Sequence, residues 1–316
     1  MSCLIPALTA NIAEQSYDLN SDEIRLNSYD LGMAQIVRLR QRAPLQLFGH
    51  TDLGWRMSPR FSDFEWTIKG ADLPGYRDLR EQLIEIFVPR VDDPVQLIFD
   101  FGDRVRALDV NLDGELLWRN RAGNIEQVSG VFESADPRLY DPDLITEIFD
   151  LAGSAGSNLG WSVDWPVPWP IGTDELNLTK VIDYADLSRL GAPEFPLIRI
   201  VGPITNPVIE NITTGEIIDL SADGGIVLSD SSEWVDIDLT NAPRRDAKTI
   251  RDQDGASVDY NLTTDSDLAT WHLAPKGEKL ESGAYCTGQN SIRVSGDGVD
   301  SNTRVSFRYY NRYFAV

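Results

Sequence analysis

Hydrophobic and polar residues alternate along many short segments of this chain. The clearest example is the segment from Arg60 to Gly70, where Phe64, Trp66 and Ile68 occupy every second position and polar residues fill the gaps. Successive side chains of a β-strand point to opposite faces, so this pattern predicts a strand with one buried face. Residues 233–239 alternate equally cleanly and predict another half-buried strand.

The stretch from Pro196 to Leu220 contains three runs rich in β-branched residues, separated by turn-forming dipeptides. These dipeptides are Gly202-Pro203, Asn206-Pro207 and Thr214-Gly215. Proline cannot donate to a β-ladder and glycine favours tight turns, so the stretch predicts strands joined by turns and a hairpin. Weaker strands are predicted over Ala247–Arg251 and Ser257–Leu262. About ten short strands in the second half predict a jelly-roll-sized β-sandwich.

One longer segment has the helical period instead. An amphipathic helix is predicted over residues 76–88, with Leu79, Leu83 and Phe87 on its apolar stripe and Pro89 ending it. The segments on both sides read as strands, with Asp113-Gly114 as a hairpin turn. The first half is therefore predicted to be a mainly β, barrel-like domain that carries one helix.

The boundary between the two halves is predicted near residue 150. A short helix is expected from Pro142 to Ala152, because Asp141 can cap its start and Gly153 can end it. The Gly/Ser-rich residues 153–160 are then the linker. The predicted domains are residues 1–150 and 151–316. The Trp/Pro-rich segment 161–170 cannot be helical and is expected to pack as an irregular edge.

Charge restricts the function of the chain. Its formal net charge is −22, and residues 1–150, with 15 basic and 26 acidic side chains, contribute −11. Nucleic-acid binding and adhesion to anionic membranes both need clustered Lys and Arg, so neither is expected. No run approaches the roughly 18 apolar residues of a spanning helix. The start of the chain lacks the pattern of a signal peptide, so synthesis in a cytoplasm is expected.

Residues capable of chemistry are scattered. Cys3 and Cys286 lie at opposite ends of the chain and are expected to be free thiols, and His50 and His272 are the two histidines. Neither pair has the spacing of a metal site, and the sequence has no nucleophile elbow or phosphate-binding loop. The acidic turn at residues 252–255 lacks the closing Glu of a calcium loop. No catalytic, cofactor-binding or metal-binding residue is therefore expected, and the chain is not expected to be an enzyme.

Several short sequence segments, in the same order, resemble segments of the distal tail proteins of phages with siphovirus-type tails. That family has a mostly β N-terminal domain with one helix, followed by a galectin-like sandwich. The resemblance covers nearly the whole chain from about Glu23. The segments that show the resemblance are Val131–Asp141, Ile198–Gly202, Asn206–Asn211 with Thr214-Gly215, Leu273–Gly277, Asn290–Ile292 and Phe307–Tyr313.

The resemblance implies a structural function at the tail tip of the virion. Such proteins form hexameric rings that continue the tail tube and connect it to the tail-tip hub and to receptor-binding or side-fibre proteins. The genome would pass through the lumen without specific binding, since an acidic lumen repels phosphates. The expected ring contacts are Arg38 and Arg40 on a predicted strand, and Tyr76, Leu79 and Leu83 on the predicted helix.

A second function remains open at this point. Galectin-like sandwiches often bind sugars, so the chain could be a carbohydrate-binding module or a polysaccharide-acting protein. Such a site needs an exposed aromatic ring beside polar groups. The residues that could supply it are Trp234, Trp271 and His272. Burial of both tryptophans would exclude this alternative.

Overall fold

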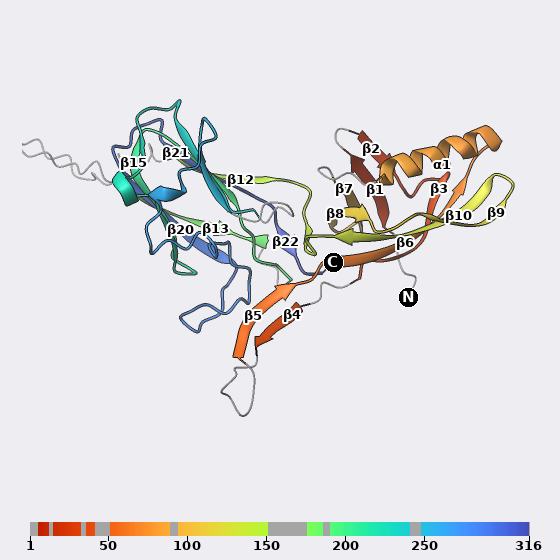
Figure 1. The fold of residues 1–316 in the computed structure, drawn as a ribbon, viewed down its shortest axis with the longest axis horizontal. Helices are drawn as coiled ribbons and strands as arrows, with labels where there is room; N and C mark the ends of the chain where they lie inside the picture. The colour runs from red at the N-terminus through yellow and green to blue at the C-terminus, as the bar shows by residue number, and fades with distance from the viewer. Residues whose placement is uncertain are drawn as a thin grey trace, which may run out of the picture. The chain divides into compact units, whose positions relative to one another are not determined.

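The computed structural model describes residues 6–12, 15–32, 36–41, 51–88, 94–150, 176–185, 190–240 and 248–315. The chain divides into two compact units, whose strands and helix are labelled in Figure 1. Unit 1 comprises Met1–Pro142 with Phe314–Val316, and unit 2 comprises Asp143–Tyr313. The division falls eight residues before the predicted one, because a strand at Ile145–Asp150 belongs to unit 2.

Unit 1 is built on a long antiparallel sheet in the order β2-β1-β7-β8-β10-β6-β3, with β9 paired to β10 and β11 to β8. Two further strands, β4 (Ile36–Gln41) and β5 (Thr51–Met57), form a separate two-stranded sheet. The strands of the long sheet are β1 (Ala7–Ile12), β2 (Gln15–Asp18), β3 (Ile24–Asp30), β6 (Arg60–Lys69), β7 (Val95–Asp100), β8 (Val105–Leu112), β9 (Leu117–Ala122), β10 (Ile125–Ser134) and β11 (Leu139–Tyr140).

The core of unit 1 confirms the alternation predicted for β6. Phe64, Trp66 and Ile68 are at most 2% exposed, while the residues between them face outward. Phe99 of β7 lies 6.0 Å from Phe64 between ring centroids, although β8 and β10 separate their strands in the sheet. The sheet therefore curls around a single aromatic core, as expected of a barrel-like domain. Each large side chain buried there contributes roughly 1.5–3 kcal/mol.

Helix α1 (Leu73–Phe87) closes this core and begins three residues before the predicted start. The side chain of Asp72 accepts a hydrogen bond of 2.8 Å from the backbone N–H of Gly75, which satisfies one of the free donors of the first turn. Pro74 lies in that first turn, where its missing N–H costs nothing. At the other end, Phe87 packs on Phe132 of β10 with ring centroids 4.7 Å apart.

Unit 2 is a sandwich of two five-stranded antiparallel sheets, as predicted. One sheet has the order β12-β21-β14-β18-β19, and the other has β13-β20-β15-β16 with β17 beside β15. A final short strand, β22 (Arg312–Tyr313), follows β21. The strands of the two sheets are β12 (Ile145–Asp150), β13 (Leu176–Asp183), β14 (Leu197–Val201), β15 (Ile204–Asn211), β16 (Glu216–Asp219), β17 (Val227–Leu228), β18 (Trp234–Asp238), β19 (Thr249–Asp252), β20 (Gln289–Asp297) and β21 (Arg304–Tyr309).

The stretch from Pro196 to Leu220 folds as the sequence predicts. It supplies β14 to one sheet and the β15–β16 hairpin to the other, so its apolar residues face the core from both sides. Gly215 has a φ of +84° in the turn of that hairpin, a conformation that disfavours other residues. Ile198 and Ile209, from opposite sheets, are both fully buried.

Two local predictions were wrong. The helix predicted from Pro142 to Ala152 does not form over its described part; β12 pairs there with β21 over six residues, and the ring centroids of Phe149 and Phe307 are 4.9 Å apart. The predicted strand Ser257–Leu262 contains a short 3₁₀ helix, Asp259–Asn261. The predicted linker and the Trp/Pro-rich segment 161–170 lie outside the described residues.

Candidate functional site

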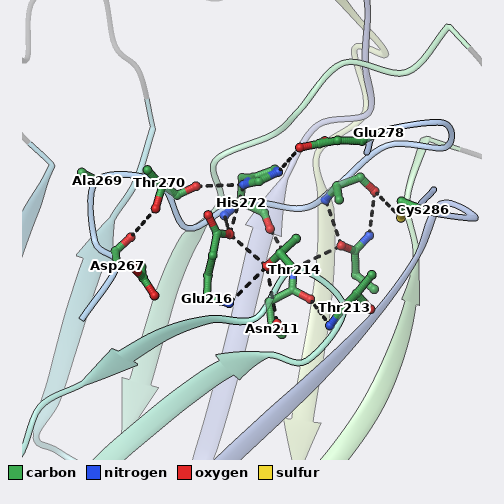
Figure 2. A network of polar contacts seen from close by, with 12 residues as sticks. Asn211, Thr213, Thr214, Glu216, Asp267, Ala269, Thr270, His272, Glu278 and Cys286 are labelled. Atoms are coloured by element: carbon green, nitrogen blue, oxygen red, sulfur yellow. Dashed lines mark hydrogen bonds and ion pairs between the residues drawn. The ribbon is translucent and has the colours of Figure 1, made fainter. Parts of the chain in front are cut away.

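A network of polar side chains in unit 2 surrounds His272, one of the residues proposed for sugar binding (Figure 2). Asn211 and Glu216 flank the β15–β16 turn. They contact a loop, distant in sequence, that carries His272 and Glu278. The segment from Asp267 to His272 consists of turns. At its start, the carboxylate of Asp267 accepts a hydrogen bond of 3.0 Å from the N–H of Ile217. The network therefore fastens a long loop to the sheet.

The imidazole of His272 lies between two carboxylates. Its Nδ1 is 3.1 Å from Glu216 Oε2 and 2.8 Å from the carbonyl oxygen of Thr270, and its Nε2 is 2.9 Å from Glu278 Oε1. Burial disfavours the charged ring, but the hydrogen bonds to Glu216 and Glu278 outweigh burial and raise its pKa to about 10. At neutral pH this side chain is an imidazolium ion that donates from both nitrogens.

Two buried asparagines fix the backbone that follows His272. Asn290 accepts a hydrogen bond of 2.8 Å from the N–H of Ala274 and donates to the carbonyl oxygen of Ala274 at 3.0 Å. Asn211 donates to the carbonyl oxygen of His272 at 2.8 Å and to Asn290 Oδ1 at 3.2 Å. Amide pairing of this kind satisfies buried backbone groups that no strand partner reaches. The two asparagines therefore have a structural role, because their amide groups bond the chain itself.

The residues proposed for sugar binding do not form a sugar platform. Trp271 is fully buried, with its ring 6.0 Å from Phe307 in the sandwich core. Trp234 is half-buried beneath Arg199, whose guanidinium carbon lies 4.0 Å from the centroid of a Trp234 ring. Arg199 is itself held by Asp236 through two hydrogen bonds of 2.6 and 2.7 Å. Core packing therefore excludes Trp271 as a sugar platform, and Arg199 covers part of the Trp234 ring.

The described residues include one buried cysteine and no group of side chains that could hold a metal ion. Cys286 is a free, buried cysteine, as predicted, and burial raises the pKa of its thiol. Among the described residues, no three His, Cys, Asp or Glu side chains are grouped to hold a metal ion. Cys3 and His50 lie outside the described residues.

The helix residues proposed as ring contacts face the interior of unit 1. Tyr76 and Leu83 are 1% exposed and Leu79 is 9% exposed. The hydroxyl of Tyr76 donates to the buried carboxylate of Glu126, and the guanidinium of Arg121 lies over the Tyr76 ring. These side chains have no area left for a neighbouring subunit, because the apolar stripe of the helix packs on its own sheet. Sequence periodicity identified the buried face, and burial excludes it as an interface.

The other proposed contacts lie on the β4–β5 hairpin. Arg38 and Arg40 belong to β4, where the backbone of Arg38 is opposite Trp55 and that of Arg40 is opposite Asp52. The register shifts between the two arginines, so the strand pairing is irregular there. Neither strand pairs with any other described strand, as the separate ribbon in Figure 1 shows.

The outer face of the unit 1 sheet has a groove that the sequence did not reveal. It has a volume of about 470 Å³ and lies over β3, β6 and β10, beside the β8–β9 connection. Leu117 and Val131, which are 41% and 38% exposed, contribute apolar surface to it. Among the described residues, no Lys or Arg lines the groove. Its five carboxylate residues are Asp30, Asp63, Glu65, Asp113 and Glu115.

These features define a mainly β protein of two units, with a curled sheet and helix followed by a two-sheet sandwich. No protein family model and no curated protein matches the sequence. The fold is similar to the crystal structure of the phage SPP1 Dit protein (gp 19.1), described as a paradigm of the hub adsorption apparatus in phages infecting Gram-positive bacteria. The TM-score is 0.56 at 13% sequence identity, covering 97% of this chain and 99% of that chain.

Two structures of the phage p2 baseplate in its activated conformation, one with Sr and one with Ca, also align with the chain. Their TM-scores are 0.44 and 0.43 at 10% and 9% identity, each covering 98% of this chain and 99% of the other. The SPP1 alignment confirms the predicted resemblance to phage distal tail proteins at the level of the fold. No helix of the described residues is long and apolar enough to cross a membrane.

Proposed function

We propose that this chain is a structural distal tail protein of a long-tailed phage, without catalytic activity, located at the tail tip of the virion. The observation that carries the proposal is the fold similarity to the SPP1 Dit protein, which covers both units and nearly the full length of each chain. An alignment of the sandwich alone would have left many functions open, because sandwiches serve unrelated purposes. The order of the two units makes the correspondence more specific.

The protein forms a hexameric ring that joins the tail tube protein to the tail-tip hub and to receptor-binding or side-fibre proteins. A ring needs a head-to-tail contact, in which two different patches of each subunit meet. The β4–β5 hairpin with Arg38 and Arg40 is one such patch, since it has no strand partner among the described residues. The buried residues Tyr76, Leu79 and Leu83 support this ring only indirectly, by holding α1 on its sheet.

The lumen of the ring is acidic and lets the genome pass without specific binding. The support is the charge of −11 over residues 1–150, which leaves few cations to hold phosphates. A filter-binding assay with double-stranded DNA at low salt, where such contacts are strongest, tests this point. Retention of DNA at micromolar protein would contradict it.

The molar mass of the purified full-length chain tests the ring itself. Six chains of 35.3 kDa give about 212 kDa by multi-angle light scattering, and this is the expected mass. A mass near that of one chain over the micromolar range would contradict the ring. The sugar-binding alternative has less support, because Trp271 is buried in the core; Trp234 is only half-buried, with Arg199 over its ring.

A further inference from the structure

Charged side chains on the outer face of the unit 1 sheet are sorted by sign along the strands. On β6, Asp63 and Glu65 point outward near one end, and Lys69 points outward at the other. Directly opposite residues of neighbouring strands share a face, so Asp30 of β3 adds to the acidic end and Arg25 lies toward the basic end. The charged face comprises Asp30, Asp63, Glu65, Asp113 and Glu115 at its acidic end, and Arg25, Lys69 and Arg119 at its basic end.

The charges of this face are not neutralised within the chain. None of the eight side chains has an ion pair with another described residue, whereas Arg199 on β14 of unit 2 pairs with Asp236 of the neighbouring strand. Asp30 lies directly opposite Asp63, and like charges in that position destabilise a sheet. From Asp63 to Lys69 the strand spans about 20 Å, beyond the Debye length of about 8 Å, so the two ends do not neutralise each other.

Each end of the charged face also has a hollow with apolar surface. At the acidic end, the groove of about 470 Å³ includes the exposed side chains of Leu117 and Val131. At the basic end, a second hollow of about 540 Å³ is lined by Arg25, Lys69 and Ile125, and Ile125 is 37% exposed. A partner that brings only charge would leave this apolar surface in water, and an apolar partner would bury charges without pairing them. The face therefore fits a partner that carries both signs of charge together with apolar side chains.

We propose that an extended segment of another tail-tip protein docks along β6 on this face, with Lys or Arg over the acidic end and Asp or Glu over the basic end. The inference rests on the proposed tail-tip function, which requires the chain to join other proteins. Charge complementarity selects this occupant, since DNA carries one sign of charge and would be repelled by the five carboxylates. An extended chain places every second side chain against the sheet, so about eight residues bridge the two ends.

Two fluorescent peptides of about eight residues test the order of the charges. Both have the same composition, with valine and threonine between the charged positions. In the segregated peptide the charged positions read Lys, Lys, Glu, Glu, and in the alternating peptide they read Lys, Glu, Lys, Glu. Fluorescence anisotropy at low salt should give the segregated peptide a dissociation constant at least about tenfold below that of the alternating peptide, and added salt should reduce the difference. Equal affinities, or no binding of either peptide, would overturn the proposal.

Charge reversal at each end of the face locates the binding. One variant carries Asp63→Lys with Glu115→Lys, and the other carries Lys69→Glu with Arg119→Glu; none of these four side chains has an ion pair within the described residues. Each variant should weaken binding of the segregated peptide by at least about tenfold, because it places like charges across the contact. Circular dichroism establishes that the variants are folded. Folded variants that bind this peptide as tightly as the wild type would overturn the proposal.

The outcomes separate this inference from the proposed ring. A control with Asp254→Lys and Glu281→Lys, two exposed carboxylates of unit 2, should bind both peptides like the wild type. If a second copy of the chain occupies the face, Asp63→Lys with Glu115→Lys gives a lower molar mass than the wild type in light scattering, and the docking proposal is overturned while the ring stands. A wild type that is monomeric but prefers the segregated peptide would contradict the ring alone.

Discussion

Replacing His272 by glutamine tests whether the ion cluster of unit 2 holds its long loop in place. Glutamine retains a hydrogen-bond donor but removes the charge that neutralises Glu216 and Glu278. A pKa raised from 6.5 to about 10 corresponds to about 5 kcal/mol at about 1.4 kcal/mol for each pH unit. Independently, removing one partner of a buried ion pair lowers the free energy of unfolding by about 3–5 kcal/mol. His272→Gln should therefore lower the free energy of unfolding of unit 2 by about 3–5 kcal/mol at pH 6.

The pH dependence of this loss distinguishes charge from packing. The pKa of His272 in the folded chain lies above that of the unfolded chain, so the stabilisation is complete below about pH 6.5 and disappears as the pH rises to about 10. The gap between wild type and His272→Gln in urea unfolding should thus shrink steadily from pH 6 to pH 10. A gap that stays constant over this range would refute the ionic account and leave only lost packing.

Hydrogen exchange locates the effect. The amide of Ala274 donates to Asn290 and the amide of Cys286 donates to the carbonyl oxygen of Glu278, so both should exchange faster in His272→Gln. Amides of unit 1 should be unaffected. Arg104→Gln, which removes a fully exposed ion pair with Asp103, is the matched control and should leave the unfolding midpoint unchanged.

Three further predictions concern single side chains. Asp72→Ala removes the helix cap and should lower the free energy of unfolding of unit 1 by about 1 kcal/mol in urea titrations. Asp72→Asn should keep most of the wild-type stability, because asparagine also caps helices. In a Cys3→Ser background, Cys286 should react with a thiol reagent only after unfolding; rapid reaction of the native protein would contradict its burial. Phe132→Ala should cost about 3–5 kcal/mol by thermal unfolding, whereas Phe61→Ala, which is half exposed on the same sheet, should cost little.

Elements with a strong local signal could be predicted from the sequence. The alternation through Phe64, Trp66 and Ile68 reports burial directly, because one face of β6 meets the core. Thr214-Gly215 marks a hairpin because glycine tolerates the φ of +84° that the turn requires. The helix was predicted from its apolar stripe, although its first turn depends on the capping bond of Asp72.

Elements that depend on distant partners could not be predicted. Residues 145–150 have the flanking residues of a helix, but pairing with β21, more than 150 residues later, makes them a strand. The surroundings of His272 depend on Glu216, which lies 56 residues earlier and reaches it only when the loop folds onto the sheet. The groove likewise combines carboxylates from three separate segments of the chain. The two-residue period of one strand shows which of its side chains share a face, but not which other strands lie beside that face.

The ring is the central claim, and images of single particles test it most directly. Electron micrographs of the purified full-length chain, sorted into classes without imposed symmetry, should show rings of six subunits around a central opening. The same preparation of the Arg38→Glu, Arg40→Glu variant should contain mainly single subunits. Wild-type particles that are uniformly monomeric, or closed assemblies without a central opening, would contradict the account.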